Sequence, residues 1–430
     1  MVYLRMYRDV LVIGAGVLGL SSALHLKRLN PDRKVLVIDR MGAPGQGNTA
    51  KSAGIFLNLF TTEVNYLLGD STTDWFRHLQ GDLGHRLNLT QCGYLYLLDE
   101  ARYRNLKKPI SEMRRRGVQL ETYDRESLQR LMPDLVPDPH DGGRALMGLE
   151  PVEAGVLGVK CGCVDTDSLA RALEAEFLKL GGEVSYNTVA ERLIVRPERE
   201  LGVPGEPFVW QDLTVAGAET NTGVISAETT VVAAGVWSER LLDPIGFDTL
   251  MRPKKRSIFV FDDPRLGRLR ETKGFSEHDL LPFTDIPELT VYIKADPTEG
   301  NIWLGCADDF GRGYGLEDEP SPERGLYSNN IYHALVEYLP CFRDVRPVNS
   351  WAGQRAINRY DGAPVVAPGP GLIYVGSASG YGITKCDGIG RTVAAAYSGE
   401  EDVELYGGRH IEASSLGVEK RDVGREAFKV

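Results

Sequence analysis

The hydrophobic pattern is clearest at the start of the chain. Residues 9–13 form a short apolar run of the kind expected for a buried parallel strand, and residues 34–38 form a second one. Between them, residues 20–29 carry apolar side chains at helical spacing, and Asn30-Pro31-Asp32 ends that helix. The order strand, helix, strand predicts a βαβ unit of the dinucleotide-binding kind.

Strands of two kinds follow along the rest of the chain. Continuous apolar runs, typical of buried parallel strands, recur at 229–235 and 372–375. Antiparallel patterns lie between them, with strands or hairpins at 93–98, 213–226, 258–261, 289–293 and 301–304. Further helices are predicted over 168–180, 320–338 and 388–397. We therefore expect an α/β fold in which the chain passes back and forth between a domain with a parallel sheet and a second domain with a mixed, largely antiparallel sheet.

The first apolar strand runs directly into Gly14-Ala15-Gly16-Val17-Leu18-Gly19, a GxGxxG motif. Its first glycine permits a tight turn, its second lets the backbone approach a pyrophosphate, and its third lets helix and strand pack closely. The pyrophosphate then lies at the helix N-terminus, where free N–H groups favour an anion. The second strand ends in Asp39, where an acid accepts hydrogen bonds from a ribose. The pattern predicts a Rossmann-type site for FAD or NAD rather than NADP.

Charge and cysteine content exclude some classes of protein. The formal net charge of −11 argues against a nucleic-acid partner, because phosphate binding requires a basic face. We interpret the basic run Lys254-Lys255-Arg256 as a solvated face or a pocket lining. The six cysteines are irregularly spaced, which indicates free thiols and no metal site. Without an apolar run of membrane-spanning length or a convincing signal peptide, we expect a cytoplasmic protein, with peripheral attachment to the inner membrane face as the alternative.

Four stretches carry a more specific similarity. They are VLVIGAGVLGLSSALHL at the start, Gly47-Asn-Thr-Ala-Lys-Ser-Ala-Gly54, Val231-Val-Ala-Ala-Gly-Val-Trp-Ser238, and a closing segment with Trp351-Ala-Gly-Gln-Arg355, Asp361-Gly-Ala-Pro364 and Val375-Gly-Ser-Ala-Ser-Gly-Tyr-Gly-Ile-Thr384. In this order they resemble the D-amino-acid-oxidase-like flavoproteins, which include glycine oxidase, sarcosine oxidase and the dye-linked L-proline dehydrogenases. The resemblance extends from residue 8 to residue 398, and the L-proline dehydrogenases are the most similar subgroup.

The resemblance implies where FAD binds. The expected contacts come from the glycine motif, the end of the second strand and three later stretches: Gly14, Gly16, Val17, Leu18, Gly19, Asp39, Arg40, Thr49, Ala50, Ser52, Ala53, Gly54, Val189, Ala234, Gly235, Trp237, Ser379, Gly380, Tyr381, Gly382, Ile383 and Thr384. Relatives with covalent FAD use a histidine or a cysteine at positions that here correspond to Lys51 and Gln354. We therefore expect non-covalent FAD.

The resemblance also implies a division of the chain. Residues 7–90, 151–245 and 345–400 are expected to form the FAD-binding domain. Residues 91–150 and 246–344 are expected to form the substrate domain. Residues 401–430 are expected to be a C-terminal tail.

The expected activity follows from the same resemblance. An FAD-dependent amino-acid or amine dehydrogenase or oxidase would transfer a hydride from the carbon beside the substrate nitrogen to FAD and leave an imine, with L-proline as the first choice of substrate. Arg355 is the expected clamp for a substrate carboxylate, since a guanidinium forms two parallel hydrogen bonds with it. Tyr292 and Tyr381 are expected to line the substrate pocket. The other expected partners are an electron acceptor (a dye, a quinone or oxygen) and further subunits, identical or different.

Several alternatives stay open at this stage. Glycine, sarcosine or a D-amino acid could replace proline, with oxygen as the acceptor. An FAD-dependent 2-hydroxyacid or glycerol-3-phosphate dehydrogenase would have the same cofactor domain, although a phosphate substrate needs more cationic residues in the pocket. A non-catalytic FAD-binding subunit of a larger complex is the third alternative. A structural ion pair is the alternative role for Arg355, and a core position is the alternative for Tyr292.

Overall fold

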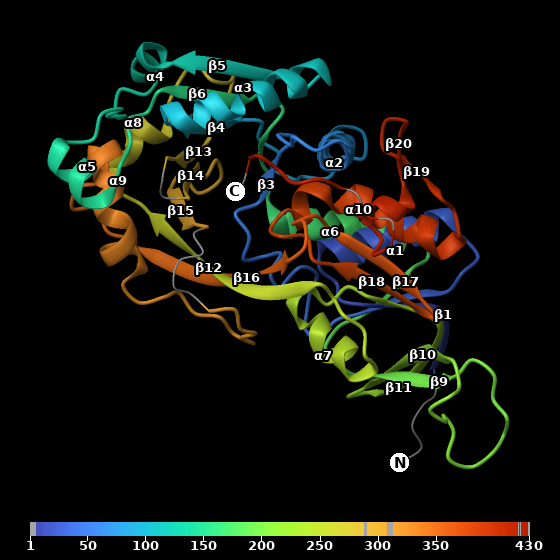
Figure 1. The fold of residues 1–430 in the computed structure, drawn as a ribbon. Coiled ribbons are helices and arrows are strands. Elements are labelled where there is room, and N and C mark those ends of the chain that lie inside the picture. Colours follow the sequence, from blue (N-terminus) through green and yellow to red (C-terminus); the bar gives the residue numbers. More distant parts are fainter. Residues whose placement is uncertain (1–5, 288–289, 308–312, 420, 422, 429–430) are drawn as a thin grey trace.

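The computed structural model describes residues 6–287, 290–307, 313–419, 421 and 423–428, and they form two large sheets with helices around them (Figure 1). The first sheet has the strand order β17-β18-β11-β1-β2-β8, and the meander of β10 and β9 extends from β11. Its strands are β1 (Met6–Ile13), β2 (Val35–Ile38), β8 (Glu183–Ser185), β9 (Ala190–Pro197), β10 (Leu213–Thr220), β11 (Gly223–Val232), β17 (Val365–Gly369) and β18 (Leu372–Gly376). The central strands β18, β11, β1, β2 and β8 run parallel, as in a Rossmann-type domain.

Four helices cover one face of the first sheet: α1 (Val17–Leu29), α2 (Glu63–Gly81), α6 (Thr166–Lys179) and α10 (Gly382–Ser398). Helix α1 packs against α10 and α6, so helices from the two ends of the chain share one core. Val10 and Val12 of β1 and Leu20 and Leu24 of α1 are fully buried there. Full burial of such a side chain stabilises the fold by about 1.5–3 kcal/mol. The alternate residues of β1, Leu11 and Ile13, face a second core beneath the meander.

The second sheet has the order β16-β12-β15-β14-β13-β4-β6-β5, and only the pair β13–β4 is parallel. Its strands are β4 (Tyr94–Leu98), β5 (Leu120–Asp124), β6 (Ala154–Gly158), β12 (Met251–Phe261), β13 (Phe283–Ile286), β14 (Val291–Ala295), β15 (Ile302–Cys306) and β16 (Asn349–Asn358). The remaining described helices are α3 (Glu100–Arg115), α4 (Arg125–Leu131), α5 (Asp141–Met147), α7 (Ser238–Leu242), α8 (Gly267–Arg270) and α9 (Tyr332–Tyr338). Two short pairs complete the fold: β3 (Ile55–Phe56) with β7 (Gly162–Cys163), and β19 (Asp402–Leu405) with β20 (Arg409–Glu412).

The predicted fold class is confirmed, and several predicted elements differ in their bounds. The helix expected over 320–338 begins only at Leu326, with a π-helical stretch before α9, and the helix expected over 388–397 begins at Gly382. Residue 289 of the strand expected at 289–293 lies outside the described residues, and β14 spans Val291–Ala295. The strand expected at 229–235 continues the hairpin strand before it, so β11 is one long strand. The strand expected at 258–261 begins seven residues earlier at Met251 and contains the basic run. The predicted domain boundaries place β6 and β16 with the FAD-binding part, whereas both strands belong to the second sheet. The division into domains stays a prediction.

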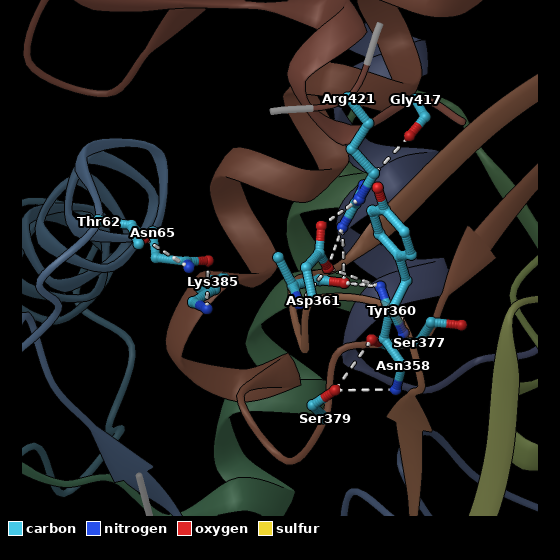
Figure 2. Close-up of polar contacts among 11 residues, drawn as sticks. Thr62, Asn65, Asn358, Tyr360, Asp361, Ser377, Ser379, Lys385, Gly417 and Arg421 are labelled. Carbon is cyan, nitrogen blue, oxygen red and sulfur yellow. Dashed lines mark hydrogen bonds and ion pairs between the residues drawn. The ribbon is translucent and has the colours of Figure 1, made fainter. Parts of the chain in front are cut away.

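The chain after α10 packs back onto the molecule. The Arg421 guanidinium donates two hydrogen bonds to the Asp361 carboxylate, from Nε at 2.6 Å and from Nη2 at 2.9 Å (Figure 2). Both side chains are buried. Glu426 accepts hydrogen bonds from the Thr61 and Thr62 backbone N–H groups just before α2. The region predicted as a tail is therefore tied to the body of the protein.

The Asp361–Arg421 pair gives a prediction about stability. Arg421→Ala leaves a buried carboxylate without its partner, which costs about 3–5 kcal/mol. We expect the midpoint of urea-induced unfolding to fall accordingly, while Arg425→Ala, which removes an exposed arginine from the same segment, leaves it unchanged. Equal midpoints for both variants would contradict a stabilising role for the pair.

Candidate active site

The loops that follow the parallel strands of the first sheet line a single deep cavity. Its volume is about 390 Å³, and Gly14, Asp39, Gly235 and Gly380 lie along it just beyond β1, β2, β11 and β18. In open α/β sheets ligands bind outside the carboxyl ends of the strands. The opposite wall comes from the second sheet, so the cavity lies between the two sheets.

The glycine motif forms one end of this cavity. Gly14 has a φ of +114°, and a Cβ there would lie 2.5 Å from the Ala233 carbonyl oxygen. A Cβ on Gly19 would lie 1.9 Å from the Gly14 carbonyl oxygen, so both positions exclude a side chain. Helix α1 begins at Val17 without a side-chain cap on Gly16 and without an acidic residue in its first turn. The Val17 N–H donates a hydrogen bond to the Thr49 hydroxyl at 3.3 Å. The other N–H groups of the first turn and the helix dipole favour an anion at this end of the cavity.

Asp39 lies beside the glycine motif. Its Oδ2 accepts a hydrogen bond from the Ala15 N–H at 2.6 Å, and its Oδ1 accepts one from the Met41 N–H at 2.8 Å. The carboxylate lines the cavity and keeps lone pairs for further donors, because each carboxylate oxygen has two. This is the arrangement expected of an acid that accepts hydrogen bonds from a ribose.

A polar and aromatic cluster lies at the same end. The Arg40 guanidinium stacks over the Trp237 ring at 4.1 Å from its centroid. The Trp237 indole donates a hydrogen bond to Asp318, which also forms a bidentate pair with Arg240. These contacts hold the Asp318 pKa below its ordinary value, with the Arg240 hydrogen bond as the largest cause. Both Arg40 and Trp237 line the cavity, and their contact with FAD stays a prediction.

The cavity brings together most of the residues predicted to bind FAD or substrate: Gly14, Gly16, Val17, Leu18, Asp39, Arg40, Thr49, Ser52, Ala53, Val189, Ala234, Gly235, Trp237, Ser379, Gly380, Gly382, Ile383, Tyr292 and Arg355. Five predicted residues do not line it. Gly19 packs directly against the Gly14 carbonyl group instead. Ala50 and Gly54 line a smaller cavity across the loop. Thr384 donates a hydrogen bond to the Ile55 carbonyl, and Tyr381 packs edge-on against Phe60.

The second sheet supplies the candidate substrate end. The Arg355 side chain passes over Gly380, where a Cβ would lie 2.9 Å from its Nε. Tyr292 is buried, and its ring lies over Gly305, where a Cβ would lie 2.1 Å from the ring. Phe283 stacks on Tyr292 with ring centroids 5.0 Å apart. A guanidinium and an aromatic wall therefore share one end of the cavity.

Lys385 lies behind this end, at the start of α10. It is buried, its Nζ donates a 2.7 Å hydrogen bond to Asn65 (Figure 2), and it lies over the rings of Phe60 and Tyr381. Burial lowers the Lys385 pKa to about 7. The family motif identified Tyr381 but contained no signal for this lysine, because its partners come from α2 and the loop before it.

Two other residues at the site, Ile258 and Phe283, were missed by the sequence reasoning. They line the cavity from the second sheet together with Arg256 and Gln354. The basic run was interpreted as a solvated face or a pocket lining, and the structure separates its members: Lys254 is buried, Arg256 lines the cavity, and Lys255 pairs with Glu317. Phe283 and Ile258 resemble ordinary core residues in the sequence.

The residues present fit FAD. The glycines that exclude a Cβ, the uncapped helix end and the carboxylate beside it form one continuous surface along the cavity. Lys51 and Gln354 line it, and none of the lining residues in the described ranges is a histidine or a cysteine. Non-covalent attachment stays a prediction. The six cysteines are free thiols.

Neither a metal-binding cluster nor a membrane-spanning helix is present among the described residues. No group of three or more His, Cys, Asp or Glu side chains is arranged to hold a metal ion in that part of the chain. None of the helices formed by those residues is long and apolar enough to cross a membrane.

Comparison with known proteins defines the class. The family of FAD dependent oxidoreductases matches residues 9–396, and the chain belongs to it. It is therefore an FAD-dependent enzyme of the oxidoreductase class.

Individual relatives are distant. "FAD-dependent oxidoreductase domain-containing protein 1" of Xenopus laevis is 23% identical over 90% of this chain and 78% of its own length. A D-amino acid dehydrogenase of Bradyrhizobium diazoefficiens is 24% identical over 96% of this chain and 98% of its own. The crystal structure of L-proline dehydrogenase from P. horikoshii superimposes with a TM-score of 0.74 at 18% identity, covering 94% of this chain and 96% of that one.

Proposed function

We propose that this enzyme oxidises a small amino acid or secondary amine, with L-proline as the first candidate, and passes the electrons to an acceptor other than NAD. The observation that carries the proposal is the position of Arg355. It shares one cavity with the glycine motif and lies beside Gly380 and the aromatic residues of the second sheet. The similarity to a D-amino acid dehydrogenase and to an L-proline dehydrogenase supports a carboxylate-bearing amine.

Bound FAD supplies the redox step, because it accepts a hydride from the carbon beside the substrate nitrogen. The protein contributes position and electrostatics. Arg355 would hold the substrate carboxylate through two parallel hydrogen bonds, which fixes both distance and orientation. Tyr292 and Phe283 would form the apolar wall behind the substrate carbon and exclude water. Loss of the hydride from the carbon and of a proton from the nitrogen converts the amine into an imine.

The test is the visible spectrum of the purified protein, recorded under anaerobic conditions before and after adding substrates. We expect the bands of oxidised flavin to bleach with L-proline. Bleaching only with glycine, sarcosine or a D-amino acid would keep the reaction and change the substrate. Bleaching only with a 2-hydroxyacid or glycerol 3-phosphate would overturn amine oxidation, and a failure of the isolated chain to reduce an artificial dye with any of these compounds would favour a non-catalytic subunit.

A further inference from the structure

A carboxyl group without a role so far lies in the middle of the second sheet. Asp285 of β13 is paired with Tyr292 of β14 on one side and with Tyr96 of β4 on the other. Side chains two residues apart on a strand share a face, so Asp285 lies on the same face as Phe283. Phe283 and Tyr292 both line the cavity. Asp285 therefore lies on the sheet face that carries this wall, next to two of its lining residues.

Asp285 has one close polar neighbour on its own sheet. The fully buried Tyr94 hydroxyl interacts with the Asp285 carboxyl group. Asp285 keeps some exposed surface, on the strand face that also carries Phe283. A carboxylate has four lone-pair sites, so Asp285 keeps acceptor capacity for a polar group of a ligand beside the Tyr94 hydroxyl.

The charges around this carboxyl are mixed. Burial raises the pKa of Asp285 to about 7, against the opposing effects of Tyr94, Arg355 of β16 and Arg102 of α3. Tyr96 and Tyr292 also face it, and their pKa values are raised, chiefly by burial. The carboxyl group is thus close to half ionised at neutral pH, and the cationic Arg355 acts on it from the direction of the cavity.

Aromatic rings surround the carboxyl group as well. The centroids of Tyr94 and Tyr96 are 4.7 Å apart, and those of Tyr94 and Phe283 are 4.9 Å apart. Aromatic faces attract a cation, and a carboxylate among them attracts it more strongly. This end of the cavity therefore carries a cationic residue for a carboxylate and an acidic, aromatic patch for an ammonium group. The arrangement matches the two charges of an amino acid.

We propose that Asp285 binds the ammonium group of the substrate and accepts its proton before oxidation. This inference rests on the proposed function. In the step, an N–H bond of the ammonium breaks, an O–H bond forms on Asp285, and the electron pair stays on the nitrogen. That pair can then stabilise the carbon from which the hydride leaves. No oxidant or additional reactant is required.

The test compares the wild type with Asp285→Asn over about pH 5 to 10, a range that covers the carboxyl group and the substrate amine. In the wild type, kcat/KM is expected to rise through a pKa near that of Asp285, about 7, because only the ionised carboxyl accepts a proton. Asp285→Asn is expected to lower kcat/KM about 100-fold at neutral pH, a size typical of a lost general base. Its profile should instead rise only where the free amine forms, above about pH 9.

Binding separates this role from a structural one. Tetrahydrofuroic acid has the ring and carboxylate of proline with oxygen in place of nitrogen, and its dissociation constant can be read from the flavin spectrum without turnover. We expect Asp285→Asn to leave this constant unchanged and to weaken proline binding. Asp285→Glu should keep part of the pH dependence on the acid side. Asp262→Asn, an exposed change just after β12, should change neither binding constant.

The stability of the variant provides a check on folding. Because burial raises the pKa of Asp285, the folded state holds this proton more tightly than the unfolded chain. The contribution of Asp285 to stability is therefore fully present below the unfolded pKa of about 4 and is lost as pH rises through about 7. Asp285→Asn should lack this fall. If Asp285→Asn oxidises amines and its kcat/KM still rises with pH through about 7, the role of Asp285 alone is overturned. If the protein oxidises hydroxyacids but no amine, the proposed function is overturned as well.

Discussion

Gly14→Ala is expected to yield a protein that no longer retains FAD. The new Cβ would lie 2.5 Å from the Ala233 carbonyl oxygen, and the φ of +114° is one that alanine rarely adopts. Overpacking costs about 1–3 kcal/mol, and the strained backbone adds to it. The turn can relieve this strain only by moving away from β11 and disturbing the start of α1. We expect the dissociation constant for FAD to rise by at least about 100-fold, or about 2.7 kcal/mol.

The measurement is the ratio of flavin to protein absorbance after purification, followed by titration of the apoprotein with FAD. Gly42→Ala is the matched control, because it lies in the loop after β2 and its Cβ would have only an ordinary contact, 3.6 Å from Asn187. A Gly14→Ala protein with full flavin content would contradict the assignment of this turn to the pyrophosphate.

Arg355→Ala is expected to reduce kcat/KM for the amino-acid substrate about 100- to 1,000-fold. Removing one member of a buried, hydrogen-bonded charge pair costs about 2–5 kcal/mol, and each 1.4 kcal/mol is about tenfold. Arg355→Lys should recover only part of the loss, because an ammonium cannot form the two parallel hydrogen bonds of a guanidinium. The loss of kcat/KM should occur only with substrates that carry a carboxylate.

Pyrrolidine, which is proline without its carboxylate, is therefore the diagnostic substrate. The rate with pyrrolidine should be low in the wild type and nearly unchanged in Arg355→Ala. Flavin content should stay full in the variant, and Arg252→Ala, an exposed change on the neighbouring strand, should keep wild-type kinetics. An equal loss with both substrates would indicate a structural ion pair rather than a carboxylate clamp.

The sequence predicted the first βαβ unit well because the residues that define it are close together in the chain. The apolar run at 9–13, the glycine motif and Asp39 occupy β1, the turn before α1 and the end of β2. Most predicted cofactor residues came together for the same reason, since each follows a strand whose carboxyl end lies at one edge of the first sheet. The family motifs also identified Arg355 as a site residue, and its role as a carboxylate clamp stays a prediction.

The missed features depend on contacts between distant segments. β12 begins at Met251 because its polar residues pair with β16 on one edge and, further along, with β15 on the other, which hydrophobic periodicity does not reveal. Asp285 is a single acid in a short strand, and only the strand register places it beside Tyr96 and Tyr292. The C-terminal segment is held by ion pairs and hydrogen bonds to Asp361, Thr61 and Thr62. Its weak hydrophobic pattern therefore did not reveal where it packs.

The threading of the chain has a consequence for its biosynthesis. β1 lies between β2 and β11, and α1 packs against α10, so the first sheet and its core require segments spread over nearly the whole sequence. During translation the N-terminal unit leaves the ribosome long before residues 223–232 and 382–398 can cover it. The apolar faces of β1 and α1 therefore stay uncovered until most of the chain has been synthesised, and the complete cavity forms only after α10 has joined the sheet.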